Sequence, residues 1–149
     1  LAFGLISLSA PAVAGVSCMV NFDSDCPTES HDVCGVNMRS DVGCVVDGLG
    51  LCYDTGVFAV RVNAGETAIF RLPAGTDMME VFFADTGGAV PGQFRVLSAS
   101  GQPLARIFSN GNCTSTMPAR QTIQTAGAAR WVVVKAGDSN VYVDSLEIY

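Results

Sequence analysis

Hydrophobic and polar residues alternate in short runs from Val57 to the end of the chain. The runs are rich in β-branched and aromatic residues, and turn signals containing Gly, Asn or Pro separate them. Short strands spaced roughly 8–12 residues apart are typical of an antiparallel sandwich or barrel. No segment of useful length has the period of an amphipathic helix. The predicted strands are 58–62, 67–72, 78–83, 94–99, 104–108, 120–125, 130–135 and 141–149.

The alternation also predicts which side chains of two central strands face the interior, because successive side chains of a strand point to opposite faces. In the strand 78–83, Phe82 is then expected beside Glu80 on the wetter face. The predicted core positions of 67–72 and 78–83 are Ala68, Phe70, Leu72, Met79, Val81 and Phe83.

The last strand is predicted to bury a carboxylate. Strict alternation places Tyr142 and Asp144 on the same face as Leu146 and Ile148, which is the better core face because the other carries Glu147. A buried carboxylate is costly unless it is hydrogen-bonded, ion-paired or bound to a metal. Asp144 is therefore expected to have a partner.

Residues 17–56 differ from the rest of the chain in composition and pattern, since they are acidic, rich in cysteine and poorly periodic. We expect a leading strand at 16–22, followed by a long loop that disulfides hold. An even number of cysteines in an exported chain indicates three disulfides, for which six cysteines allow 15 connectivities. If all six pair, at least one N-terminal cysteine must reach Cys113. The cysteines are Cys18, Cys26, Cys34, Cys44, Cys52 and Cys113.

The first 14 residues are uncharged and apolar, and they end in Ala12-Val13-Ala14. This pattern resembles the end of a secretory signal peptide, so cleavage is predicted after Ala14. The alternative is a hydrophobic first strand. The remaining residues, 15–149, have the usual size of one domain, and we expect that domain to be secreted or at the cell surface.

The amino-acid composition limits which classes of binding partner are expected. Hydrophobic residues make up 49% of the chain, which excludes a disordered segment. The net charge of −6 argues against nucleic acid and against anionic membrane surfaces as partners. No membrane span is expected in 15–149.

The two ends of the domain carry a resemblance to a known class. The final V-x-V-D-S-L-E-I (141–148) and the leading V-N-F-D-S (20–24) resemble the ends of jelly-roll carbohydrate-binding modules of exported bacterial proteins. The resemblance implies an all-β fold, namely an antiparallel, jelly-roll-like β-sandwich, here with a disulfide-rich N-terminal loop region. It also implies that the first and last strands lie together and share a structural Ca²⁺. The matching positions for its ligands are Asp144 and Asp23.

The same resemblance implies a glycan or another surface polymer as the ligand. Aromatic rings are the usual platforms for sugars, and the candidates are Trp131, Phe82 and Tyr53. Trp131 shares a face with Val133 and Lys135, and packing in the core is the competing interpretation for each aromatic residue.

No constellation of catalytic residues stands out, so an enzyme is not expected. We therefore predict a non-catalytic extracellular binding module, with a structural or adhesive surface component and a small secreted hydrolase as the alternatives.

Overall fold

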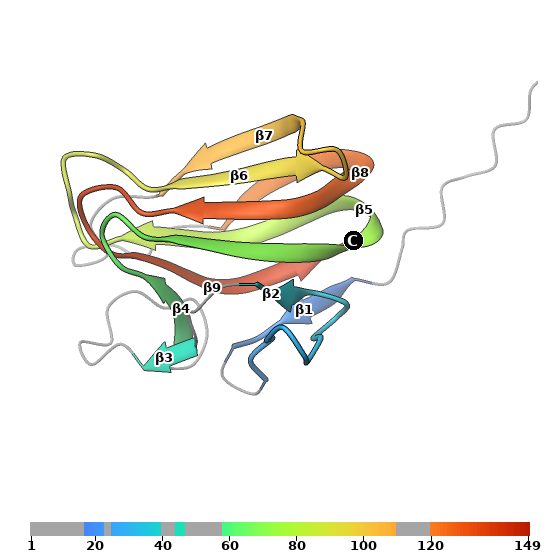
Figure 1. Ribbon diagram of the computed structural model, residues 1–149, viewed down its shortest axis with the longest axis horizontal. Helices are drawn as coiled ribbons and strands as arrows, with labels where there is room; N and C mark the ends of the chain where they lie inside the picture. The colour runs from blue at the N-terminus through green and yellow to red at the C-terminus, as the bar shows by residue number, and fades with distance from the viewer. Residues whose placement is uncertain (1–16, 23–24, 40–43, 47–57, 110–119) are drawn as a thin grey trace, which may run out of the picture.

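The protein is built from antiparallel β-strands, as the computed structural model shows for residues 17–22, 25–39, 44–46, 58–109 and 120–149 (Figure 1). None of the described residues forms a helix long and apolar enough to cross a membrane. The predicted cleavage point after Ala14, and also Asp23, Cys52, Tyr53 and Cys113, lie outside the described residues. The strands are β1 (Cys18–Val20), β2 (Asn37–Met38), β3 (Cys44–Val46), β4 (Phe58–Val62), β5 (Thr67–Asp85), β6 (Gln93–Ser98), β7 (Pro103–Phe108), β8 (Gln121–Lys135) and β9 (Val141–Ile148).

Two long strands connect the halves of a β-sandwich. The strand order is β3-β4-β9-β5-β8-β6-β7, with β1 paired to β9 and β2 paired to β5. Residues 67–71 of β5 pair with 131–135 of β8 beside β6, whereas residues 78–81 of β5 pair with 121–124 of β8 beside β9. Strands that bend from one layer into the other form the corners of a sandwich. The predicted jelly-roll-like fold class is confirmed.

The bend in β5 corrects one expectation. The segment Pro73-Ala74-Gly75 was expected to end a strand, but β5 continues through it with register shifts between Arg71 and Met78. Gly75 has φ 82°, and the hydroxyl of Thr76 donates a hydrogen bond to the carbonyl of Pro73 at 2.9 Å. In β8 the same position holds Ala126 (φ 50°) and Gly127 (φ 75°). Both strands therefore bend together, and the predicted pairs of short strands are joined into long ones.

One hydrophobic core fills the space between the halves. All six positions predicted from the alternation of 67–72 and 78–83 belong to it, together with residues of β1, β2, β4, β6, β8 and β9. The rings of Phe83 and Phe94 meet there with their centroids 5.8 Å apart. Burial of this apolar surface is the main favourable contribution to folding.

A bulge in β9 changes the expected faces of the last strand. Val81 pairs with Leu146 and Phe83 pairs with Val143, so two residues, Asp144 and Ser145, stand opposite the single residue Phe82. Such an extra residue shifts the alternation by one position. The core face of β9 therefore consists of Val141, Val143, Leu146 and Ile148.

The prediction that Tyr142 shares that core face is therefore wrong. Tyr142 lies in a second cluster with Ala59, Phe82 and Ala84. Phe82 is likewise not on a wet face, because it is fully buried in this cluster. Periodicity predicted the faces of straight segments correctly and failed at the bulge.

Two disulfides hold the N-terminal region against the sandwich. Cys18 bonds to Cys34, and Cys26 bonds to Cys44, with Cα–Cα distances of 5.8 and 6.0 Å. The first links β1, which lies beside β9, to the loop before β2. The second links that loop to β3, which pairs with β4.

Candidate functional site

Trp131 lies on an outward-facing sheet surface, in the last regular row before the strands bend. Its neighbours in β8, Val132 and Val134, are buried in the core, whereas Trp131 itself is partly exposed. Arg71 of β5 and Leu97 of β6 are its partners on either side. The guanidinium of Arg39, which directly follows β2, lies over the indole ring at 5.7 Å from the ring centroid, within the range of a cation–π interaction.

The surface around this ring extends over four adjacent strands, which Figure 1 shows side by side as β5, β8, β6 and β7. Next to the row of Trp131 runs a row with Ile69, Val133, Arg95 and Arg106, one from each strand. We call this surface the tryptophan face. It comprises Arg39, Thr67, Ile69, Arg71, Gln93, Arg95, Leu97, Arg106, Phe108, Trp131, Val133 and Lys135.

The face combines exposed apolar rings with cationic and polar groups. Phe108 is 44% exposed and Ile69 is 36% exposed. The guanidinium of Arg106 lies 5.0 Å from the ring centroid of Phe108. Flat apolar surfaces next to hydrogen-bonding side chains are the chemistry that binds amphipathic ligands such as sugars.

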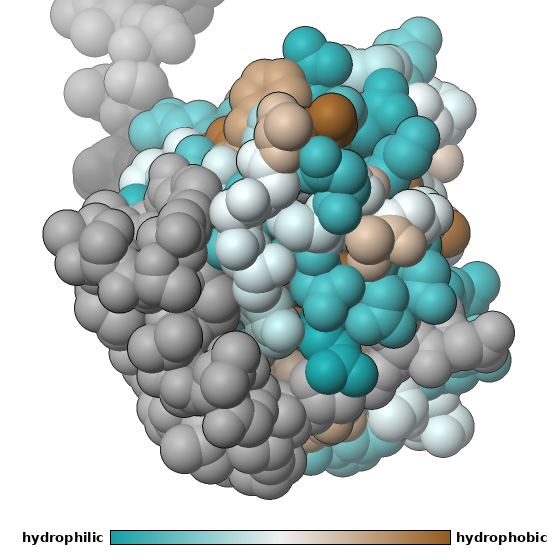
Figure 2. All heavy atoms as spheres, turned by 90° about the vertical axis from the view of Figure 1, so that its left-hand side faces the viewer, coloured by the Kyte–Doolittle hydropathy of each residue, from teal (hydrophilic) through white to brown (hydrophobic). Residues whose placement is uncertain are grey.

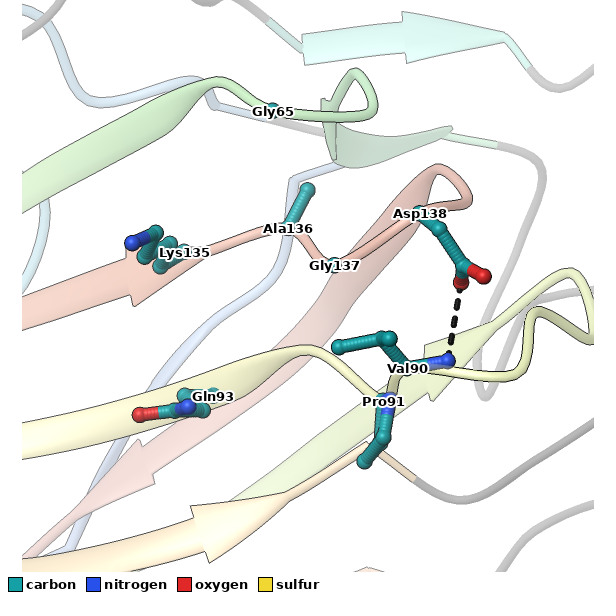
Figure 3. Close-up of a pocket in the computed structure, with 8 residues that line it drawn as sticks. All are labelled: Gly65, Val90, Pro91, Gln93, Lys135, Ala136, Gly137 and Asp138. Atoms are coloured by element: carbon teal, nitrogen blue, oxygen red, sulfur yellow. Dashed lines mark hydrogen bonds between the residues drawn. The ribbon is translucent and has the colours of Figure 1, made fainter.

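A pocket opens where the tryptophan face meets the end of the sandwich (Figure 3). Its volume is about 390 Å³, which lies in the range of ligand pockets. Figure 3 shows Lys135 and Gln93, which are register partners on β8 and β6, with Val90 and Ala136 beyond them. The pocket is lined by Gly65, Val90, Pro91, Gln93, Lys135, Ala136, Gly137 and Asp138.

Hydrogen bonds fix the turns that form this end of the molecule. The carboxylate of Asp138 accepts hydrogen bonds from the backbone N–H groups of Ala89 and Val90, both at 3.0 Å. A Cβ atom on Gly137 would lie 2.0 Å from the carbonyl oxygen of Val90, so only glycine permits this close approach. Figure 2 views this end directly and shows mainly hydrophilic and neutral residues. The contacts of Asp138 and the close approach at Gly137 hold the turns of the pocket wall in place.

The other predicted ligand-binding aromatic residues do not join this site. Phe82 is fully buried, so its ring offers no face to a ligand. Tyr53 lies outside the described residues. Trp131, by contrast, is partly exposed and does not belong to the core clusters of the described residues.

Asp144 is fully buried, as expected, but it lies in the bulge of β9 rather than on the regular core face. The predicted contact of the first and last strands is confirmed, since β1 pairs with β9 and Val20 stands opposite Leu146. Among the described residues, however, no group of three or more His, Cys, Asp or Glu side chains could hold a metal ion. Calcium takes 6–8 oxygen ligands. Asp144 is the one predicted ligand that the structure describes, so the calcium site stays a prediction.

The one histidine of the chain, His31, contacts a carboxylate within the described part of the protein. His31 Nε2 lies 2.7 Å from a carboxylate oxygen of Asp25 on an exposed loop. The described contacts of His31 include no serine, so they do not form the nucleophile–base pair of a hydrolase.

Sequence reasoning missed the cationic side chains of the tryptophan face. Arg95 and Arg106 each occupy an exposed position of an alternating strand, which was a usable signal. Their juxtaposition depends on which strands are neighbours, and alternation within one strand does not contain that information.

The fold is a β-sandwich of the kind found in carbohydrate-binding modules and adhesin domains. The K2 cleaved adhesin domain of Lys-gingipain is similar with a TM-score of 0.61 at 13% identity, over 90% of this chain and 99% of that one. A CBM61 carbohydrate-binding module, solved in complex with β-1,4-galactotriose, is similar with a TM-score of 0.53 at 16% identity, over 87% and 93% of the two chains. A CBM36 domain of a multidomain xylanase from the hindgut metagenome of Trinervitermes trinervoides gives 0.52 at 11% identity, over 90% and 97%. No protein-family model and no curated protein sequence matches this chain. At these identities the likeness shows the fold.

Proposed function

We propose that this protein is a non-catalytic carbohydrate-binding module that works outside the cell. The observation that carries the proposal is the partly exposed Trp131 on an outward sheet face, with the guanidinium of Arg39 over its ring and Arg71 as its partner on β5. An indole ring in this position offers a flat apolar surface to the C–H face of a sugar, and the neighbouring guanidinium groups donate hydrogen bonds to its oxygens.

Two further observations support the proposal. Solved carbohydrate-binding modules share the fold over most of their length. Two disulfides among the described cysteines fit an oxidising compartment, where secreted proteins fold.

The chain provides its own reporter for a test, because Trp131 is its only tryptophan. Titration with soluble polysaccharides, neutral and acidic, should change the intrinsic fluorescence of Trp131 and saturate. Trp131→Ala should weaken binding, measured by isothermal titration calorimetry, by about thirtyfold, as expected for a hot-spot residue worth about 2 kcal/mol. Trp131→Phe should retain part of the affinity.

Phe82→Leu is the matched control, since Phe82 is aromatic but buried away from the tryptophan face. It should lower stability and leave the affinity of the folded protein unchanged. The proposal fails if a broad panel of polysaccharides gives neither a fluorescence change nor heat of binding.

A further inference from the structure

The basic residues of this acidic protein are concentrated on the tryptophan face. The chain has 8 Lys and Arg residues and a net charge of −6. Five of the 8 lie on this face, and no Asp or Glu does. The five are Arg39, Arg71, Arg95, Arg106 and Lys135. The local charge of the face is therefore opposite in sign to that of the whole molecule.

These five cations are not neutralised within the described part of the protein. Arg120, away from the face, pairs with Glu147 at 3.5 Å, and Arg130 donates a hydrogen bond to the carbonyl of Leu72 at 2.7 Å. None of the five forms an ion pair with a described carboxylate. The acidic side chains in the neighbouring turns are engaged elsewhere, since Glu66 accepts from Asn63 and Asp138 accepts from the backbone of the 86–92 loop.

Two of the cations directly oppose each other. Arg95 of β6 and Arg106 of β7 are register partners, and both are exposed. Like charges directly opposite on neighbouring strands destabilise a sheet. An anion bound between the two guanidinium groups would remove this repulsion, so the arrangement favours a negatively charged ligand.

We propose that the tryptophan face binds an acidic polysaccharide whose sugars carry carboxylates. This inference rests on the proposed carbohydrate-binding function and specifies its ligand class. Four of the five cations are arginines, whose planar fork matches a carboxylate in two parallel hydrogen bonds. Trp131 adds the apolar platform that a sugar ring requires and that a bare polyanion does not use. The expected ligand therefore has both carboxylates, which bind the arginines, and sugar rings, which stack on Trp131.

The test compares polygalacturonate with the same polymer after methyl esterification, which removes the charge and keeps the backbone. Binding is followed by Trp131 fluorescence and calorimetry at low salt and at high salt. We expect polygalacturonate to bind at least about tenfold more tightly than the esterified polymer. The preference should shrink as NaCl is added, because salt screens exposed charges.

Variants locate the effect on the face. Arg95→Gln together with Arg106→Gln should weaken binding of polygalacturonate by about tenfold, as expected for the loss of two solvent-exposed ion pairs. The melting temperature of this double variant should stay the same or rise, because the repulsion is removed. Arg61→Gln is the matched control, since it removes a positive charge from β4 outside the face. It should change the affinity by less than about twofold.

Each other outcome overturns the inference in a recognisable way. Equal, Trp131-dependent binding of the charged and the esterified polymer refutes the acidic ligand and leaves the proposed function standing. The absence of binding to all polysaccharides overturns both. If dextran sulfate binds more tightly than polygalacturonate, with the same dependence on Trp131, the acidic groups of the ligand are sulfates and the carboxylate inference is wrong. If duplex DNA binds as tightly as polygalacturonate and this binding does not depend on Trp131, the tryptophan face is a nonspecific surface for polyanions.

Discussion

The Cys26–Cys44 disulfide links the stability of the domain to its candidate binding surface. Cys44 begins β3, which pairs with β4, and Cys26 lies in the loop before β2. The segment between the two cysteines includes β2 and Arg39, whose guanidinium lies over Trp131. Replacing both cysteines by serine would open the loop that encloses this segment.

The expected loss of stability follows from loop length. The disulfide closes a loop with a sequence separation of 18 residues, and Cys18–Cys34 closes one of 16 residues. On the chain-entropy model, cross-links of this length stabilise by about 3 kcal/mol each. That is a large part of the roughly 5–15 kcal/mol that holds a typical domain together, and it corresponds to a fall in melting temperature of about 10 °C.

The two disulfides form a matched pair for the experiment. Cys26→Ser with Cys44→Ser and Cys18→Ser with Cys34→Ser should lose similar free energies of unfolding in guanidinium chloride. The affinity for the polysaccharide ligand should fall about threefold only in the first variant, because the loop of Cys18–Cys34 ends before Arg39. Equal losses of affinity in both variants, or a loss of less than about 1 kcal/mol of stability in each, would refute the reasoning.

Three further predictions concern the ends of the domain and the last disulfide. If buried Asp144 ligates a structural Ca²⁺, chelation should lower the melting temperature of the wild type, and Asp144→Asn should lower it and abolish any response to added Ca²⁺. An unchanged wild-type melting temperature after chelation contradicts the calcium site. Because the four described cysteines pair with one another, we expect Cys113 to be oxidised and bonded to Cys52. Non-reducing peptide mass mapping should find that linked pair and no free Cys113 thiol. Secreted material should begin at Gly15 on N-terminal sequencing, and a mature chain that still contains residues before Ala14 excludes the predicted cleavage.

The alternation of residues predicted an all-β sandwich or barrel and the core positions of two central strands, and the resemblance at the two ends of the domain specified the jelly-roll-like sandwich. Hydrophobic positions repeat every second residue in 67–72 and 78–83, and these positions face the core. The partial exposure of Trp131 was not decided by that pattern. Alternation grouped it with Val133 and Lys135 but did not state whether another layer would cover their face. In the structure no core cluster of described residues includes Trp131.

Tertiary structure decided where the pattern breaks. At the bulge, Asp144 and Ser145 of β9 stand opposite the single residue Phe82 of β5. The position of a bulge depends on the register with the partner strand, which the sequence of one strand does not specify. For the same reason Pro73-Ala74-Gly75 looked like a turn, whereas β8 bends beside it at Ala126 and Gly127 and keeps the strands paired.

The sequence by itself determined the composition of the candidate site, and only the tertiary structure assembled it. Each cation of the tryptophan face was visible as an isolated basic residue in an acidic chain. The strand order β5-β8-β6-β7 brings them together around Trp131, with Arg39 following the short β2 on the other side of β5. Long-range strand pairing fixes such neighbours through backbone hydrogen bonds and core burial. The local alternation of side chains specifies a face but not which strand lies beside it.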